Sequence, residues 1–263
     1  MAIIQSIYRY PIKGLSPEAL SRVLLAPGEA VPGDRIYAIE NGPSGFDRVT
    51  QPYRAKTHFL MLMKNERLAA LRTEFDHATH RLTIAPPTPA SSPPQARGEQ
   101  RRITADLQRA EGRAAIERYF AQYCADELRG PPKILHAPGH SFSDVARKVV
   151  SIINLASVNA IESLVEAPVD PLRFRANIYA ESWPAWSELE FVGQVLAIGA
   201  AQLKVVKRIV RCAATDVDPQ TGIRDLAIPQ ALMLALGHAD CGIYAEVIRA
   251  GEIAEGDAIE IVK

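Results

Sequence analysis

Short β-rich runs, each followed by a turn signal, constrain the fold of this chain most. Up to about residue 84, stretches rich in β-branched and apolar residues alternate with turn sequences such as Pro32-Gly33-Asp34 and Asn41-Gly42-Pro43. The predicted strands are Ala2–Tyr10, Leu20–Leu25, Ile36–Glu40, Phe59–Met63, Leu68–Thr73 and Leu82–Ile84. This pattern indicates a region built mostly of strands.

A second β-rich region begins near Arg173 and follows two predicted helices. Its predicted strands are Asn177–Glu181, Leu189–Ile198, Gln202–Val210 and a final pair, Tyr244–Arg249 and Glu252–Val262, that is typical of the closing strands of a barrel. Residues 111–129 follow a helical period, and Gly130-Pro131-Pro132 ends that helix. The second helix is predicted to begin with Ser157 as its N-cap and to bury Val158, Ile161, Leu164 and Val165. The expected fold class is mixed, mainly β with a few helices.

The length of 263 residues allows one large domain or two small ones. Five prolines lie between Ala85 and Arg102, among Ser, Ala and Arg residues, and such a composition does not bury a core. We therefore predict a flexible surface insertion or linker at about 85–102, an N-terminal domain over 1–110 and a second domain over 111–263.

Composition excludes several classes of function. The 30 basic and 30 acidic residues cancel, so no global positive field favours nucleic acid. No apolar run approaches the roughly 18 residues that a membrane-spanning helix needs. The first ten residues alternate and then meet Pro11, which predicts a strand rather than a signal peptide. Three widely separated cysteines do not form a disulfide framework, so we expect a cytoplasmic protein.

Cys212 is the residue with the most distinctive chemical setting. It follows Arg211, and Lys204, Lys207 and Arg208 precede it in a predicted strand, a basic setting that favours the thiolate. The sequence Asp218-Pro219-Gln220-Thr221-Gly222 behind it predicts a turn. From these residues alone, a functional thiolate and a partly buried structural cysteine are equally supported.

Two phosphatase classes are excluded at this cysteine by single residues. A cysteine phosphatase needs an Arg six residues after its nucleophile, where this chain has Asp218. Asp216-Val217-Asp218 is similar to the double aspartate of phosphoaspartyl phosphatases, but those enzymes continue with Gly and Thr, where this chain has Pro219-Gln220. Neither phosphatase mechanism is therefore expected in the stretch around Cys212.

The other two cysteines carry weaker signals. Cys124 lies on the apolar face of the predicted 111–129 helix, which is typical of a buried structural cysteine. Cys241 lies in a predicted loop with His238 and Asp240, and these three residues amount to half of a metal site. Nothing at zinc-ligand spacing completes that site, so a dedicated metal centre is not expected there.

Five separated stretches occur in an order that resembles a known family. They are Tyr10-Pro11-Ile12-Lys13-Gly14, Gly33-Asp34-Arg35, Arg173-Phe174-Arg175-Ala176-Asn177, Arg211-Cys212 with Val217-Asp218-Pro219-Gln220-Thr221-Gly222, and Gly242-Ile243-Tyr244-Ala245. Together they resemble the two-part MOSC architecture, an N-terminal MOSC β-barrel domain followed by the MOSC β-barrel domain proper. The mitochondrial amidoxime-reducing component and bacterial proteins that detoxify N-hydroxylated bases share this architecture. The resemblance covers nearly the whole chain.

The resemblance implies a molybdenum cofactor, a pterin dithiolene that carries molybdenum, with Cys212 as the protein ligand of the metal. A soft thiolate suits a metal that dithiolene sulfurs already hold. The domain is also described as one that binds pyridoxal phosphate, and the resemblance implies this for the domain type only. Gly14 departs from the family pattern because many members have Ser there, so a backbone contact would replace a side-chain one. Cys241, if it lies near the site, would be a second thiol.

The resemblance also assigns the residues around the cofactor. Basic residues that match the family positions near the phosphate and the pterin are Lys13, Arg35 and Arg175, and residues of the same motifs placed to hydrogen-bond the pterin are Asn177 and Arg211. Arg and Lys are the side chains that bind phosphate best. Without the family context, an ordinary surface salt bridge is the better explanation of each basic residue. The role of Asp144 stays open.

The implied function is reduction of N-hydroxylated or other N-oxygenated small molecules. This chain ends at Lys263 without the iron–sulfur domain of some bacterial relatives, so a separate protein would donate the electrons. One alternative is a sulfur-carrier or cofactor-carrier protein that uses a persulfide on Cys212. Another is a binding protein without catalytic activity, which the presence of Cys212 and all three basic residues disfavours.

Overall fold

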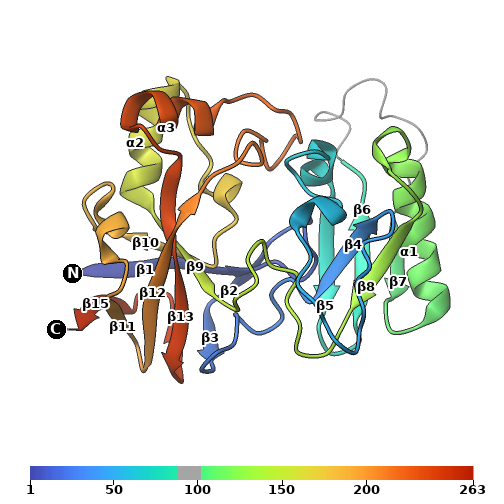
Figure 1. The fold of residues 1–263 in the computed structure, drawn as a ribbon, viewed down its shortest axis with the longest axis horizontal. Helices are drawn as coiled ribbons and strands as arrows, with labels where there is room; N and C mark the ends of the chain where they lie inside the picture. Colours follow the sequence, from blue (N-terminus) through green and yellow to red (C-terminus); the bar gives the residue numbers. More distant parts are fainter. Residues whose placement is uncertain (88–101, 263) are drawn as a thin grey trace.

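In the computed structural model of the chain, the structure is described for residues 1–87 and 102–262 (Figure 1). The predicted Pro-rich insertion at 85–102 therefore lies largely outside the described residues. In the described ranges the chain is mainly β, with three α-helices and short 3-10 turns, as the sequence predicts.

Seven strands form a closed barrel. Six of them lie side by side, and the seventh, β1 (Ala2–Arg9), closes the barrel because it pairs with β15 on one side and with β10 on the other. The order around the barrel is β10 (Ile178–Glu181), β9 (Val150–Asn154), β13 (Asp240–Arg249), β12 (Ala201–Val210), β11 (Val195–Ile198), β15 (Ala258–Val262) and β1. A short strand, β2 (Glu18–Leu20), extends from β1. The first strand of the chain thus completes a barrel made otherwise of its last half.

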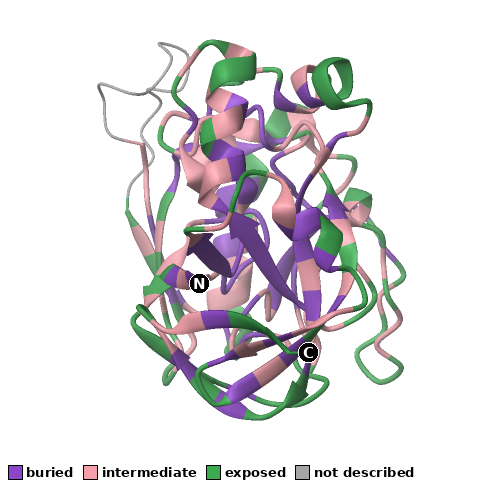
Figure 2. Ribbon diagram, turned by 90° about the vertical axis from the view of Figure 1, so that its left-hand side faces the viewer, coloured by how far each residue is buried: buried purple, intermediate pink, exposed green. Residues whose placement is uncertain are grey.

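Alternation of apolar and polar residues decides which side chains face the barrel interior. In β12, Leu203 and Val205 are buried while Lys204 between them is exposed, because successive side chains of a strand point to opposite faces. The apolar side chains of β1, including Ile4 and Ile7, join the same core. Figure 2 shows the buried residues concentrated in the strands and the exposed residues in the loops and on the outer helix faces.

A second packed region lies beside the barrel (Figure 1). It contains a pair of strands, β4 (Tyr37–Asn41) with β8 (Pro132–His136), a three-stranded sheet and one helix, α1 (Ala110–Tyr123). The strands of that sheet are β5 (Arg72–Asp76), β6 (Arg81–Ala85) and β7 (Ile103–Asp106). Helix α1 packs its apolar face into this core, as predicted, but it ends at Tyr123 and not at residue 129; Cys124 follows it as a buried residue, which confirms the predicted burial. Burial raises the pKa of the Cys124 thiol to about 12.

The remaining elements complete the barrel domain. Helices α2 (Leu155–Val165) and α3 (Ile228–Leu236) contact each other at one end of the barrel, and β3 (Arg22–Leu25) pairs with β14 (Gly251–Ala254). The 3-10 turns are η1 (Lys56–His58), η2 (Glu66–Ala70), η5 (Ala125–Glu127), η6 (Pro171–Phe174) and η7 (Ser187–Phe191). No helix among the described residues has both the length and the apolar character to cross a bilayer.

The domain boundary that we expect between residues 110 and 111 stays a prediction. The core packing shows where each segment contributes. The buried core residues of the second region all lie between Ile12 and Ile134, whereas the barrel core is formed by β1, by Val23, Leu25 and Val31, and by residues from 150 onward. The chain therefore begins in the barrel, forms most of the second region with residues 12–134, and returns to the barrel at β9.

Two predicted strands, Leu20–Leu25 and Glu252–Val262, are each divided into two strands, and three others are replaced by turns in whole or in part. Residues 59–63 form a buried turn after one bridge from Phe59 to Glu40, because the side chain and backbone of Asn65 bond the backbone of Met61. Residues 66–70 form η2, and the strand begins only at Arg72. Residues 187–191 form η7 before β11. In each case a short apolar run is buried without strand pairing, which periodicity does not distinguish from a strand.

The start of α2 differs from the prediction. The N-cap is Asn154, whose side-chain oxygen accepts a hydrogen bond from the amide of Ala156 at 3.0 Å. Ser157 lies inside the helix, fully buried, and donates to the carboxylate of Glu188 at 2.8 Å. Leu164, expected to be buried, is exposed. The prediction failed because Ser157 has a tertiary partner, which the sequence of the helix does not reveal.

Glu188 is expected to be a strong determinant of stability. Its carboxylate is buried and accepts hydrogen bonds from Ser157 and from Asn154, the latter at 2.9 Å, so it joins η7 to the start of α2. Glu188→Ala removes the acceptor of the buried Ser157 hydroxyl and one of the two acceptors of the Asn154 amide, and we expect the free energy of unfolding, measured by urea titration, to fall by about 2–4 kcal/mol. Glu190→Ala, on the exposed side of the same turn, is the matched control and should change it by less than about 0.5 kcal/mol. Equal effects of the two substitutions would contradict this role.

Candidate functional site

A cavity of about 220 Å³ lies between the barrel and the second region. Its walls come from the loops after β1 and β4 on one side and from the ends of β9 and β12 on the other. All six residues predicted for the site line it: Lys13, Arg35, Arg175, Asn177, Arg211 and Cys212. The structure thus brings together residues that are separated by up to two hundred positions in the sequence.

Cys212 lies directly beyond the end of β12, where the strand passes into a turn. The turn is tight, because the amide and the hydroxyl of Thr215 both bond the carbonyl of Cys212 at 3.0 Å. The predicted turn after it is confirmed: the Asp218 side chain accepts hydrogen bonds from the amides of Gln220 and Thr221, and Gly222 has φ of +70°. Cys212 is partly exposed and forms part of the cavity lining.

The cation in contact with the thiol is Lys56, which the sequence did not reveal. Its ammonium lies 3.2 Å from the sulfur of Cys212, and it comes from η1 in the other packed region. Of the three basic residues in β12 that we expected to act on the thiol, Lys204 points outward, whereas Lys207 and Arg208 line the cavity and Arg208 bonds the carbonyl of Leu189. Lys56 stands in a segment without any recognisable motif, so only the tertiary contact identifies it.

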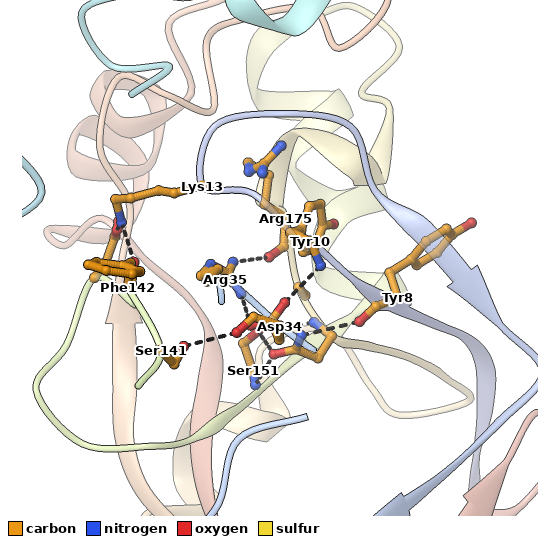
Figure 3. Close-up of polar contacts among 12 residues, drawn as sticks. Tyr8, Tyr10, Lys13, Asp34, Arg35, Ser141, Phe142, Ser151 and Arg175 are labelled. Atoms are coloured by element: carbon orange, nitrogen blue, oxygen red, sulfur yellow. Dashed lines mark hydrogen bonds and ion pairs between the residues drawn. The ribbon is translucent and has the colours of Figure 1, made fainter. Parts of the chain in front are cut away.

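Asp144 connects two cavity lysines. It forms ion pairs with Lys13 and with Lys56, the latter at 3.4 Å, and Lys13 also donates to the carbonyl of Phe142 at 2.9 Å (Figure 3). Burial lowers the pKa of the Lys13 ammonium, while Asp144 opposes that effect. The open question about Asp144 is thereby answered in structural terms: it holds both lysines at the cavity wall.

The ion pairs of Asp144 predict a pH-dependent contribution to stability. Burial raises the pKa of this carboxyl, but Lys13 and Lys56 outweigh burial and hold it well below the ordinary 3.8. A lowered folded-state pKa stabilises the protein above the unfolded-state pKa, and this stabilisation is lost as pH falls through the folded-state value. Since the carboxylate is partly exposed, Asp144→Asn should cost about 1 kcal/mol in urea unfolding at pH 7.

That difference between Asp144→Asn and the unchanged protein should shrink when unfolding is repeated below pH 3. Asp126→Asn, at an exposed position of η5, is the control and should show no such trend. A deficit that is the same at both pH values would mean that the lost contacts do not involve the charge of Asp144.

Arg35 and Arg175 lie against one tyrosine. Their guanidinium carbons are 5.0 and 4.2 Å from the centre of the Tyr10 ring, and Arg35 also donates to the carbonyl of Arg175 at 3.1 Å (Figure 3). Asp34 pairs with Arg35 and accepts a hydrogen bond from the amide of Tyr10 at 2.8 Å. Both arginines have φ of +51°, an uncommon backbone conformation for residues with a side chain. The Gly33-Asp34-Arg35 and Arg173–Asn177 motifs therefore meet at this point.

Only one of these two guanidinium groups has a carboxylate partner. Arg35 has Asp34, whereas Nη2 of Arg175 is buried and has no hydrogen-bond partner within the described residues. Burial lowers the pKa of Arg175. A buried cation without a counter-ion is costly, so this position is suited to an anion supplied by a ligand.

Arg211 is a second arginine with an unused buried donor. Its Nε and Nη1 atoms donate to the carbonyls of Cys241 and Phe174 at 2.7 and 3.0 Å, and Nη2 has no partner in the described part of the chain. Gly242 has φ of +80°, and a Cβ there would lie 2.9 Å from Nη2 of Arg211, so glycine leaves room for this guanidinium.

Asn177 lines the cavity but is already engaged by the protein. Its side-chain oxygen accepts hydrogen bonds from the amide and the hydroxyl of Ser151 at 3.1 and 2.8 Å, and its amide nitrogen donates to the carbonyl of Tyr8 at 3.2 Å. The residue therefore joins β1 to β9. Its predicted contact with the pterin stays a prediction.

The charges around the cavity fit the cofactor that the resemblance implies. Eight Lys or Arg residues line it, with Asp144 as the one acidic residue in the lining. Three arginines that line it, Arg173, Arg175 and Arg211, each have a buried nitrogen without a partner in the described residues, and such N–H groups suit the phosphate and the polar edge of a bound pterin. Within residues 1–87 and 102–262 no group of three His, Cys, Asp or Glu side chains forms a metal site, so a metal on Cys212 would take its other ligands from the cofactor.

Cys241 does not join this site. It is fully buried in the apolar cluster beneath α2 and α3, and burial raises the pKa of its thiol to about 12. His238 lies 3.9 Å from Asp240, and no further ligand in the described ranges approaches them closely enough to complete a metal site.

Comparison with known proteins identifies the family. Residues 1–128 match the MOSC N-terminal beta barrel domain and residues 137–260 match the MOSC domain. This chain is a MOSC protein. The family resemblance that the sequence motifs indicated is thereby confirmed, and the two matches together account for nearly the whole chain.

Solved structures similar to this MOSC protein include the YUAD protein from Bacillus subtilis, with a TM-score of 0.45, 14% identity, and coverage of 99% of this chain and 96% of that one. YiiM from Geobacillus stearothermophilus has a TM-score of 0.34 and 18% identity, with coverage of 43% of this chain and 54% of that one. No curated protein matches the sequence.

Proposed function

We propose that this MOSC protein binds a molybdenum cofactor in the cavity at Cys212 and reduces N-hydroxylated or other N-oxygenated small molecules. The observation that carries the proposal is the meeting of three features in one cavity: the partly exposed thiol of Cys212, a lining whose charged residues are eight cations and Asp144, and buried nitrogens of Arg173, Arg175 and Arg211 without partners within the described residues. Each feature matches one part of the cofactor: metal, phosphate and pterin.

Different residues of the chain would bind different parts of the cofactor. Cys212 provides the thiolate ligand, and the ammonium of Lys56 at its sulfur offsets the negative charge there. Lys13, Arg35 and Arg175 neutralise the phosphate, and Arg211 and Asn177 line the part of the cavity that would hold the pterin. Asp144 keeps Lys13 and Lys56 in place. When bound, the cofactor supplies a metal that exchanges electrons and oxygen with the substrate.

The overall reaction breaks the N–O bond of the substrate and yields an amine and water. It consumes two electrons and two protons. The chain has three cysteines, two of which are buried away from the cavity, so the proposal places the source of electrons in a separate donor protein. Since all three cysteines are free, a reducing compartment such as the cytoplasm suits the protein.

The decisive test is cofactor content together with turnover. The chain is produced in a host that makes the cofactor, molybdenum and pterin are measured per chain, and reduction of an N-hydroxylated amidine by dithionite-reduced methyl viologen is followed without oxygen. We expect about one molybdenum per chain and formation of the amidine in proportion to viologen oxidised. Protein that lacks molybdenum, or holds it without any turnover, would contradict the proposed activity.

A sulfur-carrier function is the second candidate. The contact of Lys56 with the partly exposed sulfur of Cys212 would also stabilise the anion of a persulfide. Mass spectrometry of the intact chain, before and after reduction, separates the two functions. A persulfide adds the mass of one sulfur to the peptide that contains Cys212 and disappears on reduction, whereas a ligand thiolate adds none.

A further inference from the structure

Arg175 is held in the cavity wall by an aromatic ring. Its guanidinium carbon lies 4.2 Å from the centre of the Tyr10 ring (Figure 3), and within the described residues its side chain has neither a hydrogen-bond acceptor nor a carboxylate partner. A guanidinium that stacks on a ring contacts it through its face, so the N–H groups in its plane stay free. The N–H groups of Arg175 are therefore available to a ligand in the cavity.

The ring of Tyr10 is itself fixed by the surrounding structure. Its side chain is fully buried, and its hydroxyl lies 3.4 Å from the hydroxyl of Tyr179. The carbonyl of Tyr10 accepts a hydrogen bond from the amide of Arg35 at 2.7 Å. The Tyr179 hydroxyl accepts another from the amide of Ala176, the residue after Arg175, at 3.2 Å. The two tyrosines thus fix both the ring and the backbone that carries Arg175.

The same ring also lies against the second arginine of this group. The guanidinium carbon of Arg35 is 5.0 Å from the centre of the Tyr10 ring, and Arg35 donates to the carbonyl of Arg175 at 3.1 Å. Two cations held so close repel each other, and both are attracted by the electron-rich face of an aromatic ring. The ring of Tyr10 therefore offsets part of the repulsion between Arg35 and Arg175 before an anion is bound.

We propose that Tyr10 is a positioning residue of the anion site, whose ring holds the guanidinium groups of Arg35 and Arg175 together so that both bind one phosphate group. For the identity of the natural ligand, the phosphate of the cofactor, this assignment rests on the proposed function. Donors that are arranged in advance favour affinity, because binding then does not have to order long side chains. Tyr10 itself acts through the two arginines.

The test measures phosphate binding to protein prepared without cofactor, so it does not depend on turnover. Inorganic phosphate is titrated into isotope-labelled full chain at constant ionic strength, and the NMR signals of the arginine side chains give the dissociation constant. We expect Tyr10→Leu to weaken phosphate binding at least about tenfold, since the contacts of both guanidinium groups with the ring are lost.

Tyr10→Phe is the conservative variant. It keeps the ring and removes only the hydroxyl, so its phosphate affinity should stay within about threefold of the unchanged protein. Tyr10→Met, which fills more of the space of the ring than leucine but has no π-electrons, should behave like Tyr10→Leu. It also provides the comparison if Tyr10→Leu does not fold.

Tyr8→Leu is the matched control. Tyr8 lies two residues earlier in the chain, and its ring packs edge-on against Tyr179 with the ring centres 5.5 Å apart. The substitution removes the same kind of side chain beside the same partner ring, so it should leave the dissociation constant for phosphate unchanged.

A double variant separates positioning from a general loosening of the site. In the Arg175→Met background, Tyr10→Leu should weaken phosphate binding by no more than about threefold, because one of the two guanidinium groups on which the ring acts is already absent. An equal loss in both backgrounds, an equal loss in Tyr10→Phe and Tyr10→Leu, or no saturable phosphate binding by the unchanged protein would overturn the role of Tyr10.

The two proposals fail separately. If phosphate binding depends on the ring but protein from the cofactor-producing host holds no molybdenum or reduces nothing, the reductase function is wrong and the role of Tyr10 stands. If molybdenum content and turnover are as proposed but phosphate binding is the same with and without the ring, the reductase function stands and the role of Tyr10 is wrong.

Discussion

Cys212→Ala is expected to abolish molybdenum retention and turnover together. The substitution removes the one thiol among the described residues that line the cavity, and eight of the other lining residues are cations, which do not bind a metal. Turnover with reduced viologen should fall by at least about a hundredfold, and molybdenum measured by mass spectrometry should fall to background. The free energy of unfolding of cofactor-free protein should change by less than about 1 kcal/mol, because Cys212 is only partly buried.

Cys124→Ala is the matched control for this change. It removes a thiol that is buried in the core behind α1, away from the cavity, so it should lower stability by about 1–2 kcal/mol and leave molybdenum content as it was. Cofactor loss in both variants would point to a general effect of unfolding. Full molybdenum and activity in Cys212→Ala would show that the metal has another ligand.

Arg175→Met should affect stability and cofactor binding in opposite directions. The guanidinium of Arg175 is buried with an unpartnered N–H and without a carboxylate, so an apolar side chain of similar length relieves a cost in the cofactor-free protein. We expect the free energy of unfolding without cofactor to stay equal or to rise by about 1–3 kcal/mol. Retained molybdenum and pterin should fall at least about tenfold, because an anion site has lost its cation.

Arg173→Met, two residues earlier in the chain, provides the contrast. Arg173 is also buried, but Asp225 and Asp218 pair with it and it donates to the carbonyl of Asp216 at 3.1 Å. Its loss breaks these ion pairs and should lower the free energy of unfolding by about 1–3 kcal/mol. The loss is limited because the partly exposed carboxylates regain water. Urea unfolding of both variants without cofactor checks the opposite signs. A clear loss of stability in Arg175→Met would mean that its stacking on Tyr10 outweighs its missing counter-ion.

Much of the site could be predicted because its motifs are local. The stretches around Lys13, Arg35, Arg175 and Cys212 are each short, and all of them line one cavity in the structure. The turn from Asp218 to Gly222 was also predictable, since an aspartate side chain and a glycine with positive φ specify it without distant partners. Roles that depend on neighbouring residues in the chain can be predicted from the sequence.

Other features depend on contacts between distant segments. Ser157 has the composition of an N-cap but bonds Glu188, and Asn154 caps the helix instead. The apolar run at residues 59–63 is buried as a turn, although its composition is that of a strand. Composition predicts that such residues are buried, but the geometry in which they are buried is set by what packs against them.

By itself the sequence determined the mainly β character of this protein, the MOSC motifs and the thiol at the end of a strand. Only the tertiary structure decided that β1 closes the barrel, that Lys56 contacts Cys212 and that Asp144 joins Lys56 to Lys13. The physical reason is the range of the interactions. Turns, strand alternation and motif order are properties of neighbouring residues, whereas barrel closure and the charge around a thiol come from segments more than a hundred residues apart in the chain.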